Sequence, residues 1–264
     1  MDNGRRKAIT TLGGGLAVVG LLGTLSLRDA VAATGRRPPL KLDAKGKVIH
    51  QPLPYVPLDP DQVAERAYHN YYRGDCMYGM FGSFIEALAE KVGGVYNTYP
   101  TTVTRYGAGG VMGWGTLCGA ANGAAMAIYL VSKHPAPLID EIFNYYQQTP
   151  LPNFRPRDAK YQIVPSVAGS TLCHVSVSEW CKKSGDKSFS PQRAERCAHL
   201  VASVTRKTVE LLNAQAAGTF KAAFPIPADV QRCRSCHGQG GMLENTRGKM
   251  ACLACHEDKA KNHP

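Results

Sequence analysis

Residues 118–128 read CGAANGAAMAI, a run of small and apolar residues with the composition of a helix. Gly119 and Gly123 lie four positions apart, so a helix places them on the same face. A face without side chains lets the backbone of a second helix approach closely. We therefore expect this helix to pack tightly against another one.

Further helices are expected on both sides of this one. Apolar residues recur with helical spacing after Ser190, which is suited to an N-cap and is followed by Pro191 at the first helical position. Asp59 or Asp61 can cap an earlier helix. The expected helices are 61–68, 76–92, 118–128, 138–147 and 190–214. The fold class is therefore mainly α, with a helical core domain over residues 61–224.

Two stretches are expected to lack helix. Residues 34–60 contain six prolines and predict an extended proline-rich N-terminal arm that wraps a core or a partner subunit. Residues 93–116 are rich in glycine and threonine and predict a long irregular loop. Loops of this length in compact domains are commonly functional.

Residues 1–33 have the pattern of an export signal. Arg5, Arg6 and Lys7 precede a weakly apolar run, and the stretch 30–32, Ala-Val-Ala, forms a small-residue cleavage site. The paired arginines indicate the twin-arginine route and hence a location in the periplasm. A membrane anchor is the alternative, but five glycines dilute the apolar run.

The chain is basic, with a formal net charge of +11 over 264 residues. That length allows one sizeable core or one core with a small appendage. The charge favours an acidic redox partner or an anionic membrane surface. Such a charge raises the rate of association more than it determines which partner is bound. Nucleic acid is not expected as a partner, because export separates the protein from it and the basic residues are scattered.

Two C-x-x-C-H motifs lie at 233–237 and 252–256. In each motif two thiols are spaced to add to the two vinyl groups of a haem, and the adjacent His237 or His256 is placed to ligate the iron. The expected attachment residues are Cys233, Cys236, Cys252 and Cys255. Residues 225–264 are therefore expected to form a segment with two c-type haems.

Zinc is the main alternative for these motifs. Cys236 and Cys252 are separated by 15 residues, which falls within the spacing of zinc ribbons. However, only 8 of the 264 residues are histidine, yet one follows each cysteine pair, and a zinc site of four thiolates needs neither. Export also favours haem, since c-type haems are attached outside the cytoplasm.

Five further cysteines remain: Cys76, Cys118, Cys173, Cys181 and Cys197. Two disulfides and one buried thiol are one interpretation in an oxidising compartment. An iron–sulfur cluster is the other, because four converging thiolates suit it. Cys118 begins a helix, where the helix dipole favours a thiolate, and Cys173 and Cys181 flank a short segment that can direct both thiols inward.

The order Cys76, then CGAANG at 118–123, then Cys173 and Cys181 resembles the C_GCAxxG_C_C family of redox-active proteins. With the two haem motifs, residues 61–256 resemble the split-Soret family of c-type cytochromes. The resemblance implies a mostly helical homodimer, two haems packed at one end of each subunit, bis-histidine ligation shared between subunits, and an iron–sulfur site in the helical core.

Four of the five cysteines are the expected ligands of that iron–sulfur site. The expected ligands are Cys76, Cys118, Cys173 and Cys181. The Gly-Cys pair of the family is Leu117-Cys118 in this chain. The family pattern does not say which thiols bind metal, so Cys197 could replace one of the four.

Low-spin haems need a second axial ligand. His174 is the first candidate because it lies beside Cys173 in a constrained segment. His50, in the proline-rich arm, is the second, since that arm can cross to a neighbouring subunit.

These features predict a periplasmic cytochrome with two c-type haems that transfers single electrons between redox partner proteins, with an additional iron–sulfur cluster. No catalytic residue is assigned, because no nucleophile–base pair, P-loop or dinucleotide fingerprint occurs. One alternative is a haem oxidoreductase that reduces a small molecule at an open iron site. Another is a zinc-stabilised structural protein.

Overall fold

The computed structural model describes residues 41–260. This part of the chain separates into a short unit that ends at Ile49 and a main unit that begins at His50. The predicted signal peptide, residues 1–33, and the first part of the predicted arm, residues 34–40, lie outside the described residues. Within residues 41–260, no helix is both long enough and apolar enough to cross a membrane.

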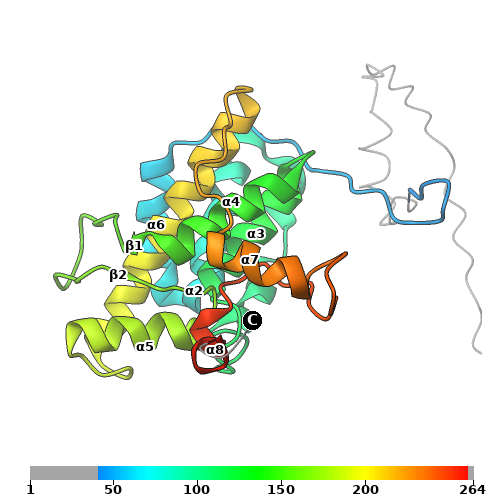
Figure 1. The fold of residues 1–264 in the computed structure, drawn as a ribbon. Coiled ribbons are helices and arrows are strands. Elements are labelled where there is room, and N and C mark those ends of the chain that lie inside the picture. Colours follow the sequence, from blue (N-terminus) through cyan, green and yellow to red (C-terminus); the bar gives the residue numbers. More distant parts are fainter. Residues whose placement is uncertain (1–40, 261–264) are drawn as a thin grey trace, which may run out of the picture. The chain divides into compact units, whose positions relative to one another are not determined.

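The main unit is mostly helical, as predicted (Figure 1). Its α-helices are α2 (Pro60–Val92), α3 (Gly119–Val131), α4 (Pro135–Gln148), α5 (Cys173–Ser184), α6 (Pro191–Ala216), α7 (Ala228–His237) and α8 (Leu253–Ala260). Two short antiparallel strands, β1 (Pro150–Leu151) and β2 (Ser166–Val167), pair Pro150 with Val167 in the connection between α4 and α5.

Helix α2 consists of two helical segments that meet at a kink, which agrees with the two helices predicted over 61–68 and 76–92; the first segment continues beyond residue 68 to the kink. Asp59 caps it, because its Oδ1 accepts the backbone N–H groups of Asp61 and Gln62. Gly74 and Asp75 leave the helical conformation, and Asp75 has a φ of 67°, which residues other than glycine rarely adopt. The kink redirects the chain immediately before Cys76.

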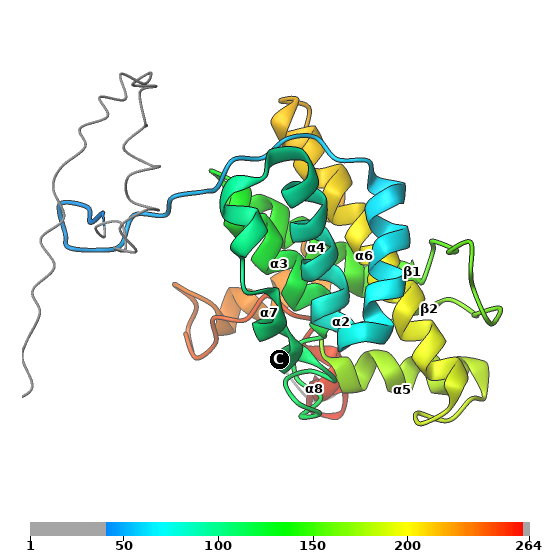
Figure 2. The ribbon, with the colours of Figure 1, turned by 180° about the vertical axis from the view of Figure 1, so that it is seen from behind.

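Helices α2, α3 and α6 pack against one another around the core (Figure 2). Phe81 and Phe84 of α2, Ile128 of α3 and Val201 of α6 are fully buried. Removing each such side chain from water contributes about 1.5–3 kcal/mol. The start of α6 agrees with the sequence, since Ser190 Oγ accepts the N–H of Arg193.

The small-residue face of α3 packs against α2, as predicted. A Cβ atom added to Gly119 would lie 2.8 Å from the Cβ of Cys76 and 2.9 Å from the backbone nitrogen of Met77. One added to Gly123 would lie 3.1 Å from the carbonyl oxygen of Met77. The two helix backbones therefore approach at the level of Cys76.

The prediction of an irregular loop over 93–116 was wrong for its first part. Two 3₁₀ helices, η1 (Gly94–Thr98) and η2 (Thr101–Gly107), cover most of residues 94–107. A short 3₁₀ helix has three residues per turn, so its sequence lacks the spacing of apolar residues by which an α-helix is recognised. Residues 108–117 contain turns and no helix.

Residues 50–59 lack helix and strand and are bound to the core of the same chain. The N–H of Leu53 donates to the carbonyl oxygen of Leu130, and the Tyr96 hydroxyl donates to that of Pro54.

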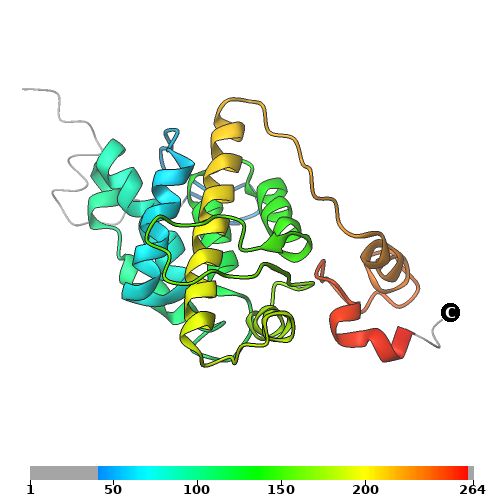
Figure 3. The same ribbon diagram turned by 90° about the vertical axis from the view of Figure 1, so that its left-hand side faces the viewer.

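At the other end of the main unit, residues 217–227 lead from α6 to α7 and α8 (Figure 3). The last two helices are therefore joined to the core by an extended connection.

Candidate metal centre and haem-attachment segment

Four cysteines from four helices form a cluster in the main unit. Cys76 follows the kink in α2, Cys118 is the N-cap of α3, Cys173 opens α5, and Cys197 lies in α6. The thiols of Cys76 and Cys197 share a hydrogen bond, and Cys118 and Cys173 are near enough to affect the charge of Cys76. We call these four residues the cysteine cluster.

Backbone hydrogen bonds join the segments that carry Cys118 and Cys173. The N–H of Cys118 donates to the carbonyl oxygen of Thr171 at 2.9 Å, and the N–H of Cys173 donates to that of Thr116 at 2.6 Å. Gly110, with a φ of 69°, fits against this pairing: a Cβ there would lie 2.8 Å from the Cβ of Cys173. The turn at 108–117 thus has a definite role, since it brings the two cysteines together.

The surroundings of the cluster favour a single thiolate at Cys197. The hydrogen bond from Cys76 lowers the pKa of Cys197 to about 5; burial opposes this shift, and two arginines of α6 support it. Burial raises the pKa of Cys173 to about 12, and the nearby Cys118 and Cys197 add to that shift. Burial raises the pKa of Cys118 as well. A cation that bound all four sulfurs would displace the remaining thiol protons.

Cys181 is linked to the cysteine cluster more weakly than the four cluster residues are to one another. It is partly exposed towards the end of α5, and burial raises its pKa, with Arg196 and Asp186 acting on it more strongly than Cys197 does. The structure thus brings together three of the four predicted ligands and adds Cys197. Among the described side chains, no group of three or more His, Cys, Asp or Glu is already arranged around a metal position.

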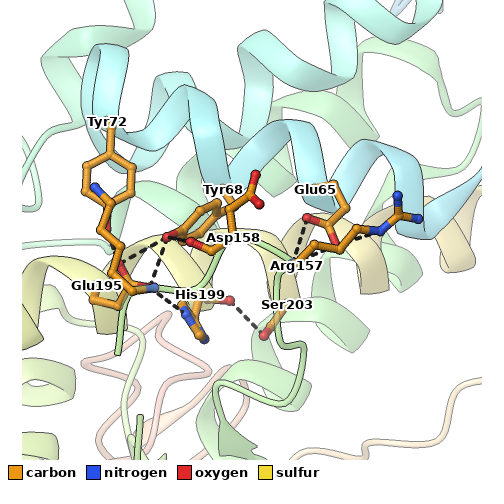
Figure 4. A network of polar contacts seen from close by, with 9 residues as sticks. Glu65, Tyr68, Tyr72, Arg157, Asp158, Glu195, His199 and Ser203 are labelled. Carbon is orange, nitrogen blue, oxygen red and sulfur yellow. Dashed lines mark hydrogen bonds and ion pairs between the residues drawn. The ribbon is translucent and has the colours of Figure 1, made fainter. Parts of the chain in front are cut away.

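A polar network around Glu195, two residues before Cys197 in α6, joins α2, α6 and the connection after β1 (Figure 4). The buried Glu195 accepts hydrogen bonds from the hydroxyls of Tyr68 and Tyr72, from the N–H of Lys160 at 2.7 Å and from Nε2 of His199 at 2.9 Å. Burial works to raise the pKa of Glu195, but these bonds outweigh it and lower the pKa. The network braces the helix that carries Cys197, and no sequence motif marks it.

The two C-x-x-C-H motifs lie on the last two helices. Cys233, Cys236 and His237 are on α7, Cys252 directly precedes α8, and Cys255 and His256 are on α8. Cys252 shares a hydrogen bond with Cys233, so the first cysteines of the two motifs are neighbours. Nδ1 of His237 donates to Oδ1 of Asn245 at 2.9 Å, which orients the imidazole.

A hollow lies beside the first motif, and two arginines in its lining suit an anionic ligand. It has a volume of about 610 Å³ and is lined by polar residues that include Arg234, Asn245 and Arg247. Nε of Arg234 is buried and has no hydrogen-bond partner in the part of the chain that the structure describes. A buried donor of this kind calls for an acceptor, and the propionates of a haem carry carboxylate oxygens.

Helix α4 binds the chain at two points, one before each motif. Oε2 of the buried Glu141 accepts the N–H groups of Ala223 and Phe224 at 2.9 and 3.0 Å. Directly before the second motif, Oε1 of Gln147 accepts the N–H of Ala251 at 3.1 Å. A salt bridge of 2.7 Å between Lys249 and Asp140 lies beside that contact.

Comparison with known proteins assigns the family. Residues 81–211 match a family described as "Putative redox-active protein (C_GCAxxG_C_C)". The split-Soret cytochrome c of Desulfovibrio desulfuricans is 37% identical over 282 aligned positions that cover 100% of both chains. The chain belongs to the split-Soret cytochrome c family. The resemblance noted in the sequence is therefore confirmed.

The fold agrees with that of a solved member of the split-Soret cytochrome c family. The structure, described as showing a novel iron centre in the split-Soret cytochrome c from Desulfovibrio desulfuricans, superposes with a TM-score of 0.73 at 35% identity. The match covers 81% of this chain and 95% of that one. The mainly helical architecture is thus shared within the split-Soret family.

The two histidines predicted as distal ligands differ in their bonding. The exposed His174 donates through Nδ1 to the carbonyl oxygen of Gly115 at 2.8 Å, which leaves the lone pair of the neutral ring on Nε2. His50 uses Nε2 to donate to the carbonyl oxygen of Ser132 at 2.9 Å, and its ring makes a tilted contact with that of Tyr129. His174 is therefore the better prepared of the two to ligate a metal of this split-Soret cytochrome.

Proposed function

We propose that this protein is a periplasmic cytochrome that carries two c-type haems and an additional iron centre, and transfers single electrons between redox partner proteins. The observation that carries the proposal is the pair of C-x-x-C-H motifs, held by α4 against a domain with a cluster of four cysteines, three of them buried, in a member of the split-Soret family. The twin-arginine signal supports the location.

In this proposal each haem is held by one motif. Cys233 and Cys236 attach the first haem and Cys252 and Cys255 the second, with His237 and His256 as proximal ligands. The haems supply a one-electron couple between ferric and ferrous iron. Arg234 and Arg247 face the hollow beside the first motif and would bind propionate oxygens.

The iron centre of the proposal is ligated by the cysteine cluster. Four thiols, three of them buried and one favoured as a thiolate, have the donor chemistry of an iron–sulfur site. The proposal takes Cys197 in place of Cys181, because Cys76 interacts with Cys118, Cys173 and Cys197, whereas Cys197 is the weakest of the groups that act on Cys181. Insertion of a cluster before export is consistent with a route that carries folded proteins.

Short hydrogen-bonded links join this cluster to the second haem motif. The N–H of Cys118 donates to the carbonyl oxygen of Thr171, and the Thr171 hydroxyl donates to Sδ of Met250 at 3.3 Å. Met250 is two residues before Cys252. In this proposal, these links fix the position of the iron centre relative to the second haem, which favours electron exchange between them.

His174 and His50 complete the haem coordination in this proposal, with the protein as a homodimer and at least one distal ligand supplied across the subunit interface. The net charge of +11 supports docking to acidic redox proteins and association with anionic membrane surfaces.

The composition of the purified protein tests the proposal. The full chain is produced with a cytochrome maturation system and isolated from the periplasm. Haem is quantified as the pyridine haemochrome, and total iron and acid-labile sulfide are measured on the same sample. The proposal expects two haems per chain, iron in excess of haem, and sulfide. Iron equal to haem without sulfide would refute the additional iron centre, and zinc without haem would favour the structural alternative.

A second candidate is a haem oxidoreductase with one open iron site. The engagement of His50 Nε2 with Ser132 favours it, because that nitrogen is not presented for ligation. Carbon monoxide distinguishes the two functions. An electron carrier with two six-coordinate haems keeps its reduced spectrum under carbon monoxide, whereas an open site shifts the Soret band.

A further inference from the structure

Arg196 is a buried cation beside the cysteine cluster. It precedes Cys197 on α6, and only 1% of its surface is exposed. Its Nη2 donates to the hydroxyl of Ser176 at 2.8 Å, with a longer contact to the carbonyl oxygen of the same residue at 3.4 Å. Both of these acceptors are neutral, so they do not balance the charge of the guanidinium.

A further donor of Arg196 is unsatisfied. Nε is buried and has no hydrogen-bond partner among the described residues. An unpaired buried charge is strongly unfavourable, and proteins retain one where an anion or a bound group balances it. The guanidinium therefore points to a negative partner in its immediate surroundings.

Arg196 interacts electrostatically with two thiols of the cysteine cluster, those of Cys197 and Cys118. It also interacts with the phenol of Tyr146 and the thiol of Cys181. The Tyr146 hydroxyl donates to the hydroxyl of Ser176 at 2.9 Å, the same oxygen that accepts from Arg196. Ser176 thus fixes the guanidinium and the phenol together, next to the sulfurs of two proposed ligands.

Arg193 is the other arginine near Cys197, but its position differs. It is half-buried, and its Nε donates to the carbonyl oxygen of Ser188 at 2.6 Å. Water screens a charge at such a site far more than one in the interior. Arg196 is therefore the cation with the stronger effect on the cluster.

We propose that Arg196 is a positioning residue for the iron centre: its fixed positive charge balances the thiolate ligands, retains the iron and raises the reduction potential of the centre. The inference rests on the iron centre of the proposed function. The physical reason is that a nearby cation stabilises the reduced form, which carries one more negative charge. Net charge and hydrogen bonds to sulfur are the protein's means of setting such potentials.

Three variants of the full holoprotein test this role. Arg196→Gln removes the charge and keeps a polar side chain that can reach Ser176. Arg196→Lys keeps the charge. Arg206→Gln is the matched control, because Arg206 lies on the same helix but is exposed and paired with Asp61 and Glu210. Site iron per haem, iron release to a chelator and the midpoint potentials of the iron centre and the haems are measured for each.

The expected result is specific to the iron centre. Arg196→Gln should weaken iron retention about 10- to 100-fold, the range seen when outer groups of a metal site are removed. Its iron-centre potential should fall while both haem potentials stay unchanged. Arg196→Lys should restore most of the retention and of the potential, and Arg206→Gln should match the wild type.

Each other outcome counts against the proposal. If Arg196→Gln keeps wild-type iron and potential, Arg196 has a structural role only. If that variant does not fold, Arg196→Lys decides: a folded Lys variant that loses iron contradicts a role for the charge. Wild-type protein without iron beyond its haems would instead refute the proposed iron centre, so the two failures are distinguishable.

Discussion

At the scale of single residues, Cys181 and Cys197 are chemically identical but have different surroundings. Cys197 is buried, shares a hydrogen bond with Cys76 and has its pKa lowered to about 5. Cys181 is partly exposed, and burial raises its pKa. A metal ion prefers the thiolate, so the environment and not the residue type selects the ligand.

This difference gives a direct test of the ligand set. Cys197→Ser is expected to lose the iron in excess of haem, whereas Cys181→Ser is expected to retain it. Iron and haem analysis of the two purified variants checks the prediction, and each variant is the control of the other. Loss of iron in the Cys181 variant alone would restore the set first predicted from the sequence.

The bonding of His174 gives a second prediction at this scale. Because Nδ1 donates to Gly115, Nε2 is available to iron. His174→Ala should therefore leave a ferrous haem that binds carbon monoxide, which appears as a shift of the Soret band. His50→Ala is the matched variant, and unchanged spectra for His174→Ala would show that this histidine is not a distal ligand.

At the scale of elements, α3 and α2 approach closely because Gly119 has no side chain. Alanine in place of glycine favours an isolated helix by about 1 kcal/mol. Here the added Cβ would lie 2.6 Å from the carbonyl oxygen of Gly107 and 2.8 Å from Cβ of Cys76. Overpacking of this kind costs about 1–3 kcal/mol, so packing outweighs propensity.

Gly119→Ala is therefore expected to lower the free energy of unfolding and to disturb the cysteine cluster. Thermal unfolding followed by circular dichroism measures the first effect, and the iron content measures the second. An unchanged or raised Tm would contradict the close approach of the two helices.

Helix α4 gives a prediction about the attachment of the last two helices. Glu141→Leu would leave the N–H groups of Ala223 and Phe224 without an acceptor, at a cost of about 1–3 kcal/mol. Asp140→Asn is the control, because the half-exposed salt bridge to Lys249 contributes only about 0–1 kcal/mol. Hydrogen exchange at residues 223–224 should become faster in the first variant and stay nearly unchanged in the second.

At the scale of the whole molecule, the net charge is a property of the surface and not of any single site: it is +11 for the full chain and +9 without residues 1–33, which hold four basic and two acidic residues. Charge of one sign accelerates encounter with partners of the opposite sign, and salt screens it over about 10 Å at 0.1 M ionic strength. Electron transfer to an acidic redox protein should therefore slow as salt is added, as measured by stopped-flow. A basic redox protein is the control, and equal salt dependence for both would contradict steering by charge.

The sequence alone determined the features that depend on local spacing. The C-x-x-C-H motifs, the cap at Ser190 and the small face of Gly119 and Gly123 are readable because each rests on residues a few positions apart. The mainly helical fold followed from the same local patterns.

Only the tertiary structure decided which cysteines gather. The sequence did not decide the role of Cys197, because its spacing fits the buried apolar face of a helix as well as a ligand position. The kink at Asp75 and the pairing of Cys118 with Thr171 bring distant segments together, and Arg196 acquires its role only there. Such contacts depend on packing between helices far apart in the chain, which no local pattern encodes.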